Sequence, residues 1–467
     1  MVLPYFKCIS RILLLIMLIS CEDFIQVDAP NTLQSSETVF ASDASANSAI
    51  AGIYTSIMDN QSFASGGDSS ITVLAGLSAD EFIDYTNSAK RDFQTNNLSS
   101  GSSLVKNSLW TQGYRCIYYA NVILEGIANS KGMSEALKRR LKGEAQFLRA
   151  FSYFYLTNMF GDIPLIVHTD YEINKKAAKV LPEDIYNQII SDLSDATELL
   201  PESYAYYMDQ QSQEERRVRP NAYAAYALLA RVYLYTHDWL MAEASATVVI
   251  NNTALYGLQD DLSQVFIAQS REAIWQLMPI DSKEDTYEEV VFTLNDIPTS
   301  ISLTDQMVNA FETDDNRKKY WVDTIIREQK TYFYPSKYKV GEKEYSIVLR
   351  LAEQYLIRSE ARAQQDKQTQ AIADINILRQ RADVPPIDES DPNIDKTVIL
   401  LAIEHERQTE LFSEWGHRWF DLKRTGRATS VLSPQKGSNW QSTDVLYPIP
   451  ASEIQKNGNL EPQNEGY

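Results

Sequence analysis

Apolar residues recur every three or four positions through most of the chain, which predicts a mainly helical protein. The longest such stretch covers residues 134–160. Its first half is apolar on one face and basic on the other, whereas its second half, from Phe147 to Phe160, is apolar almost all round. Neighbouring elements must therefore cover this second half on several sides. Gly161 ends the helix, which we expect to lie at the centre of a helical core.

Further helices are predicted where the same spacing begins or ends at a capping residue. Pro182 suits a first helical turn, and Asp238 suits an N-cap position. Small residues at helical spacing in 222–256, and again in 355–382, are similar to tetratricopeptide helix pairs, in which two helices approach closely. The remaining predicted helices cover residues 46–58, 105–128, 182–200 and 399–411.

Two long stretches depart from the helical pattern. The first excursion, residues 60–103, contains Gly66, Gly67 and many serines and asparagines. The second excursion, residues 256–349, contains predicted strands at 273–280, 331–335 and 346–351, together with aromatic residues that include Tyr332. Long irregular segments on a regular scaffold often carry function. Both excursions are therefore candidates for the functional surface.

The first 20 residues are typical of a lipoprotein signal peptide. Lys7 and Arg11 precede an apolar run that is too short to span a bilayer and that ends at a small residue before Cys21. We expect cleavage before Cys21 and lipid attachment to it; the alternative is an ordinary secretory signal in which Cys21 is incidental. Residues 22–35 are polar and suit a tether. No linker divides the remainder, so 21–467 is predicted to be a single domain.

The charge, cysteine and histidine content argues against several classes of protein. The formal net charge is −20, which disfavours a nucleic-acid partner and electrostatic docking on anionic lipid. Once Cys21 is lipidated and the signal peptide is removed, Cys116 is the one remaining thiol, so neither an internal disulfide nor a cysteine-based metal site is expected. His405 begins an HExxH-like sequence, but Thr409 occupies the position of the second histidine. We expect no metal and no cofactor.

Four passages resemble sequences of the SusD/RagB family of outer-membrane nutrient-binding lipoproteins. They are the lipobox followed by Glu22 and Asp23; GEAQFLRAFSYFYLTNMFGDIPLI with LPEDIYNQIISDLSDATELLP; LRLAEQYLIRSEARA with INILRQRA; and ERQTELFSEWGHRWFDLKRTG with YPIPASEIQKNGNLEPQN. The resemblance implies a mainly α, SusD-like fold, in which four tetratricopeptide-like helix pairs form a scaffold and the two excursions form a loop-rich, partly β face. It also implies a lipid anchor in the outer membrane, a position facing the cell exterior, and partnership with a SusC-type TonB-dependent outer-membrane transporter.

Charged residues in and after the last long helix permit two interpretations. In the first interpretation, carboxylates such as Glu404 and Glu410 form the acid/base pair of a glycoside hydrolase. Alternatively, they form ion pairs with residues such as Arg407 and Arg418 and fix the helix in place. We prefer the second interpretation, because these residues lie within the structural signature of the family. No GxSxG elbow, P-loop or paired CxxC motif is present, and we do not expect an enzyme.

Aromatic and polar residues of the excursions are the candidates for ligand contact. A sugar ring exposes C–H groups that stack on an aromatic face, and each stacked ring contributes about 0.5 to 1.5 kcal/mol. The sugar hydroxyls require Asp, Asn or Arg side chains at the rim of the site. The candidates are Asp80, Phe82, Tyr85, Asn87 and Arg91 in the first excursion and Trp275, Tyr287 and Trp321 in the second, with Trp321 and Tyr85 as the first choices.

The leading hypothesis is a non-catalytic surface lipoprotein that captures an oligosaccharide ligand and delivers it to the SusC-type transporter. Binding of peptides is the alternative, since RagB-like relatives take up peptides with the same architecture. Two further hypotheses are an outer-membrane glycoside hydrolase and a tetratricopeptide adaptor that binds only protein. Turnover of a bound glycan would favour the hydrolase, and a melting temperature that no small ligand changes would favour the adaptor.

Overall fold

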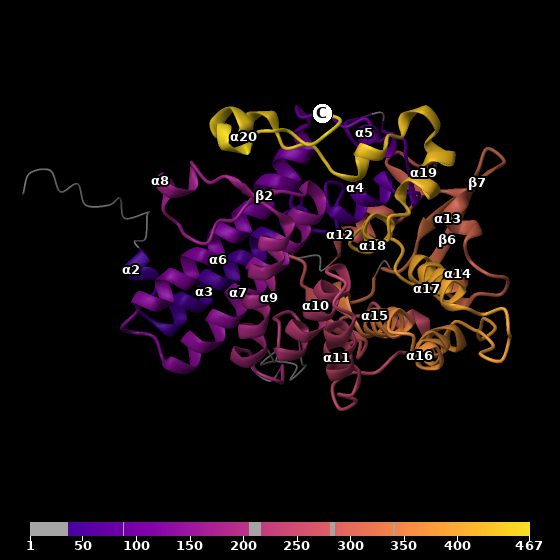
Figure 1. Cartoon of the computed structure of the whole chain (residues 1–467), viewed down its shortest axis with the longest axis horizontal. Helices are drawn as coiled ribbons and strands as arrows, with labels where there is room; N and C mark the ends of the chain where they lie inside the picture. Colours follow the sequence, from indigo (N-terminus) through magenta and orange to yellow (C-terminus); the bar gives the residue numbers. More distant parts are fainter. Residues whose placement is uncertain (1–35, 87, 205–215, 281–284, 340) are drawn as a thin grey trace, which may run out of the picture.

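The computed structural model describes residues 36–86, 88–204, 216–280, 285–339 and 341–467 (Figure 1). The predicted signal peptide, Cys21 and the tether at 22–35 lie outside these ranges. Among the helices within them, none combines the length and the apolar character that crossing a membrane requires.

The scaffold is an array of helices in which each one contacts the next in chain order. They are α3 (Asp43–Ile57), α6 (Thr111–Asn129), α7 (Glu135–Phe160), α9 (Pro182–Leu199), α10 (Ala222–Tyr235), α11 (Trp239–Ile250), α15 (Leu351–Gln364), α16 (Gln368–Arg381) and α17 (Lys396–Glu410). The array crosses Figure 1 from α3 to α16. The two segments with tetratricopeptide-like spacing form the contacting pairs α10/α11 and α15/α16. The predicted mainly helical fold is thus confirmed.

Local sequence explains where several of these helices begin and end. The hydroxyl of Ser134 accepts the N–H of Leu137 at 3.4 Å, and the carboxylate of Asp238 accepts the N–H of Met241 at 3.1 Å, so both residues act as N-caps. Gly161 follows α7 with a φ of 73°, a conformation that favours glycine. The predicted ends of α7 and the predicted start of α11 are confirmed.

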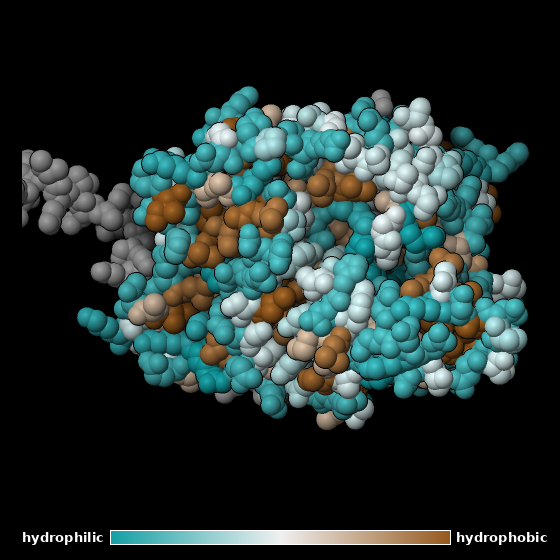
Figure 2. Space-filling view, in the orientation of Figure 1, coloured by the Kyte–Doolittle hydropathy of each residue, from teal (hydrophilic) through white to brown (hydrophobic). Residues whose placement is uncertain are grey.

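Shorter helices lie in the excursions and around the scaffold. They are α2 (Ser36–Val39), α4 (Ile71–Ser78), α5 (Lys90–Gln94), α8 (Tyr171–Asn174), α12 (Tyr287–Phe292), α13 (Asp305–Asn309), α14 (Asn316–Trp321), α18 (His417–Arg424), α19 (Ala428–Lys436) and α20 (Ala451–Lys456). A π-helical segment, η2 (Val105–Trp110), leads into α6. The surface seen in Figure 2 is mainly hydrophilic, in keeping with the high proportion of acidic residues.

The strands of the described residues form short antiparallel pairs. They are β1 (Phe82–Asp84) with β5 (Ile301–Leu303), β2 (Ile163–Pro164) with β3 (Lys179–Val180), β4 (Ala273–Leu277) with β8 (Ser346–Arg350), and β6 (Val322–Arg327) with β7 (Lys330–Pro335). The three predicted strands correspond to β4, β7 and β8. Because β1 belongs to the first excursion and β5 to the second, their pairing joins the two excursions.

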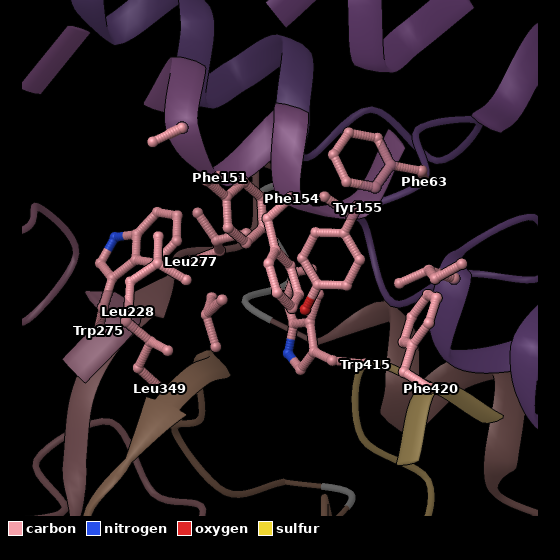
Figure 3. Close-up of a cluster of buried hydrophobic side chains, with 14 of the residues drawn as sticks. Phe63, Phe151, Phe154, Tyr155, Leu228, Trp275, Leu277, Leu349, Trp415 and Phe420 are labelled. Carbon is pink, nitrogen blue, oxygen red and sulfur yellow. The ribbon is translucent and has the colours of Figure 1, made fainter. Parts of the chain in front are cut away.

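The second half of α7 lies in an aromatic core (Figure 3). Phe151 is fully buried, and its ring centroid lies 5.1 Å from that of Trp275, 5.6 Å from that of Trp415 and 6.0 Å from that of Phe63. These partners come from β4, from the turn before α18 and from the first excursion. The helix that is apolar all round is therefore covered from several directions, as its sequence predicts.

A buried ion network fixes the end of α17 to three other elements. The carboxylate of Glu410 accepts hydrogen bonds from Arg350 at 2.6 Å and Arg317 at 3.2 Å, and from Arg381. Burial alone would raise the pKa of the Glu410 carboxyl, but the guanidinium groups of Arg381, Arg350 and Arg317 outweigh burial and hold this pKa well below its usual range. Glu410 therefore stays ionised and serves as the anchor of an ion pair, as we preferred, rather than as a general acid.

Candidate ligand-binding site

The two excursions meet at one end of the molecule, where α13, α14, β6 and β7 lie in Figure 1. Besides the pairing of β1 with β5, the Lys90 ammonium group contacts the carboxylate of Asp68 at 3.0 Å and the hydroxyl of Ser300 at 2.8 Å. Tyr85 donates its backbone N–H to the carbonyl of Ser300 at 2.8 Å, and its hydroxyl lies 3.1 Å from that of Ser302. A single face is thus built from segments more than 200 residues apart in sequence.

Three tyrosines follow one another on this face, and we call them the tyrosine row: Tyr85, Tyr332 and Tyr334. The ring of Tyr85 meets that of Tyr332 edge-on, with 6.1 Å between centroids. Tyr332 and Tyr334 are two residues apart in β7, so their side chains share one face of the β6–β7 hairpin. All three are partly exposed. The row therefore offers aromatic surface to a ligand.

A pocket of about 440 Å³ adjoins Tyr334. Its wall also includes Tyr320, Lys319, Asp323 and Lys339, so aromatic rings and charged hydrogen-bonding groups occur side by side. Burial and the nearby carboxylate of Asp323 raise the pKa of the Tyr334 hydroxyl, which therefore keeps its proton as a hydrogen-bond donor. The volume lies within the usual range for sites that hold small molecules.

The tyrosine row and its pocket contain side chains that can stack on a ligand and form hydrogen bonds with it. Among the described residues, no group of three or more His, Cys, Asp or Glu side chains is placed to hold a metal ion. The thiol of Cys116 is buried inside the scaffold, and burial raises its pKa to about 12, so it is not an activated nucleophile. Stacking and hydrogen bonding are the interactions that the tyrosine row and its pocket provide.

Three aromatic candidates from the sequence are corrected, because they face the core. Trp275 is 0% exposed and packs against Phe147 and Phe151 of α7. Trp321 is 1% exposed and donates its indole N–H to the carbonyl of Leu262 at 2.9 Å. Phe82 is buried against Phe292. These buried side chains stabilise the packing of the excursions and present no surface to a ligand.

The other five candidates have different surroundings. Asp80 is buried, and its two carboxylate oxygens accept hydrogen bonds from Arg418, each at 3.0 Å, which is a structural role. Tyr85 belongs to the tyrosine row. Arg91 is exposed on α5 and donates to the backbone carbonyl of Asp84 at 3.3 Å. Tyr287 is partly buried at the start of α12. Asn87 lies outside the described residues.

Three tyrosines of this face were missing from the candidates: Tyr320, Tyr332 and Tyr334. The segment TYFYP predicts a strand, and a strand places its first and third aromatic residues on the same side. That alternation is the available signal for Tyr332 and Tyr334. The sequence does not indicate which side is exposed, because the side is set by the contact with Tyr85 from the first excursion.

Glu81, which follows Asp80, gives a prediction about how the stability of the protein depends on pH. Burial and the adjacent carboxylate of Asp80 raise the pKa of Glu81 to about 8, whereas an unfolded glutamate titrates near pH 4.3. The stability that proton binding provides is complete below the unfolded pKa and is lost as pH rises through about 8. Glu81→Gln should therefore raise the melting temperature relative to wild type much more at about pH 9 than at about pH 5.

The matched control for this experiment is Glu135→Gln, because Glu135 is exposed at the start of α7. Its difference from wild type should be small and nearly independent of pH. Equal effects of Glu81→Gln at both pH values would show that Glu81 is ionised in the folded protein.

Comparison with known proteins agrees with this architecture. Residues 23–234 match a family model described as starch-binding associating with outer membrane, and residues 287–467 match the model of the SusD family. A SusD-like protein of Formosa agariphila is 27% identical, over 98% of this chain and 99% of that protein. The starch-binding protein SusD of Bacteroides thetaiotaomicron is also 27% identical, over 72% of this chain and 75% of that protein.

Solved structures with the same fold cover nearly the whole chain. A SusD superfamily protein from Bacteroides vulgatus superimposes with a TM-score of 0.81 and 23% identity, covering 92% of this chain and 100% of that one. A laminarin binding SusD-like protein gives a TM-score of 0.77 with 23% identity and the same coverage. The two family models, the full-length relatives and the shared fold lead to one conclusion. The chain belongs to the SusD/RagB family.

Proposed function

We propose that this protein is a non-catalytic, lipid-anchored outer-membrane protein that binds an oligosaccharide along the tyrosine row and delivers it to a SusC-type transporter. The observation that carries the proposal is the partly exposed row formed by Tyr85, Tyr332 and Tyr334 where the two excursions meet. The starch-binding relative and the family description support a glycan as the ligand class. Cys21 is the proposed site of the anchor.

In this proposal the tyrosines and the adjoining pocket contact different parts of the glycan. The sugar rings stack on the row, while Asp323, Lys319 and Lys339 pair with hydroxyls in the pocket. Successive rings suit a chain of sugar units better than a single one. A non-catalytic role agrees with the charged residues of α17, since Glu410 is buried and held by three arginines.

Removal of one ring from the row should weaken glycan binding. A panel of soluble glycans is first screened against the purified protein by affinity gel electrophoresis, and the strongest ligand is then titrated by calorimetry. Tyr332→Ala should raise the Kd of this ligand about 2- to 10-fold, which corresponds to the loss of one stacked ring. Tyr171→Ala is the control, because Tyr171 is 72% exposed on α8, at the other end of the scaffold.

The melting temperature gives a second readout. A ligand at 100 times its Kd should stabilise the wild-type protein by about 2.7 kcal/mol. An unchanged Kd in Tyr332→Ala would show that the glycan does not bind along the tyrosine row. A protein that bound no glycan in the panel but bound peptides would replace the oligosaccharide with a peptide.

A further inference from the structure

A second pocket, of about 350 Å³, lies between α11, α15, α17 and α18. In Figure 2 the surface between α17 and α18 is strongly hydrophilic and hollowed. Trp239, Leu400 and Leu401 line its mouth, and Arg407 and Asp421 lie deeper. None of the residues that line this pocket lines the pocket beside Tyr334, and none belongs to the tyrosine row. The pocket is therefore separate from the tyrosine row.

Arg407 and Arg427 of this pocket both have buried side-chain nitrogens without a hydrogen-bond partner among the described residues, but Arg427 Nε lies 2.7 Å from the carboxylate of Glu404, so Arg407 has the more open donors. It is 1% exposed, and its Nε donates to Asp421 at 2.7 Å. Within the described chain, neither Nη1 nor Nη2 of Arg407 has a hydrogen-bond partner, although both nitrogens are buried. Buried donors without partners are costly, and they are rare in folded proteins. A pocket that this guanidinium lines is therefore built to receive acceptor oxygens.

The carboxylates around Arg407 are already paired. Arg424 donates to both oxygens of Glu360, at 2.5 and 2.7 Å, and to Asp421 at 2.8 Å. Glu404 contacts Arg427 at 2.7 Å. The lining thus holds equal numbers of arginines and carboxylates, and it has no surplus positive charge for an anion. It offers two adjacent donors from Arg407 together with carboxylate acceptors, in a chain whose formal net charge is −20.

We propose that this pocket is a second sugar site, which takes one neutral hexose unit. Two neighbouring hydroxyl oxygens of the ring accept hydrogen bonds from Nη1 and Nη2 of Arg407, and a further hydroxyl donates to Glu404. The indole of Trp239 and the side chain of Leu401 cover the C–H face of the sugar at the mouth. Such a site would hold a branch or an end of a glycan while the tyrosine row holds another part.

The test measures binding of neutral methyl hexosides by saturation-transfer NMR and calorimetry. Leu401→Arg places a long cationic side chain at the mouth, where Leu401 is 44% exposed, and the substitution should therefore leave the fold intact. Its matched control is Val398→Arg, because Val398 is 43% exposed on the same helix and does not line the pocket. We expect Leu401→Arg to weaken hexoside binding about tenfold and Val398→Arg to leave it unchanged.

Two further measurements distinguish this site from the tyrosine row of the proposed function and from a site that binds anions. In Tyr332→Ala, hexoside binding at the pocket should persist even where oligosaccharide binding to the tyrosine row is weakened. Sodium glucuronate and sodium sulfate should bind more weakly than the neutral hexosides. Tighter binding of either anion would overturn the neutral class. The absence of hexoside binding, or binding that Leu401→Arg does not change, would overturn the site itself while leaving the tyrosine row to its own test.

Discussion

Replacing Phe151 with alanine should lower the free energy of unfolding by about 3 to 5 kcal/mol. The ring lies at the centre of the core in Figure 3 and packs against Phe63, Trp275 and Trp415. Its removal would leave a cavity between α7, β4 and the first excursion, which the rigid aromatic neighbours could fill only in part. Urea denaturation followed by circular dichroism measures the change.

Tyr171→Ala again provides the control, since an exposed aromatic side chain should contribute less than about 0.5 kcal/mol. At temperatures where Phe151→Ala remains folded, its affinity for glycan should equal that of the wild type. A variant that kept its stability and lost its ligand would show that α7 belongs to the binding site rather than to the scaffold.

Replacing Glu410 with alanine should cost a similar amount, about 3 to 5 kcal/mol. The substitution would leave Arg317, Arg350 and Arg381 buried around a site that has lost its carboxylate. Because the pKa of Glu410 is held well below its usual range, its contribution is present above the unfolded pKa and is lost as pH falls through the acid range. The difference between wild type and variant should therefore shrink below about pH 4.

Chemical denaturation at neutral and at acid pH tests this prediction. Glu135→Ala is the matched control, because the ion pair of Glu135 with Lys138 is exposed and should contribute less than about 1 kcal/mol. If Glu410→Ala were as stable as Glu135→Ala at neutral pH, the network around Glu410 would not be what fixes α17 to the second excursion.

The sequence was sufficient to predict the scaffold, because helix patterns and helix ends depend on nearby residues. Pro182, Asp238 and Gly161 mark helix boundaries that the structure confirms. The apolar second half of α7 likewise predicts its burial. The excursions were recognisable as departures from the helical pattern, but the pairing of Phe82 with Leu303 depends on residues far apart in the chain. Local periodicity carries no information about such a contact.

The candidate site was also only partly predictable, because it too depends on contacts between residues far apart in the chain. Trp321 was a first choice because it is large and lies in an excursion, yet it ends α14 with its indole N–H bonded to Leu262 in the interior. Large aromatic residues in irregular segments often fix those segments to the scaffold, since they bury the most surface. Tyr85 was also a first choice and lies on the predicted face. Tyr332 completes the row because β7 is brought beside the first excursion.

If the tyrosine row holds the ligand, a crystal structure of the protein with the strongest glycan of the panel should show the glycan bound there. We expect sugar rings stacked on Tyr332 and Tyr334, with hydroxyls bonded to Asp323 or its lysine neighbours in the adjoining pocket. Electron density for the glycan on another face, with the tyrosine row empty, would show that the row is not the binding site.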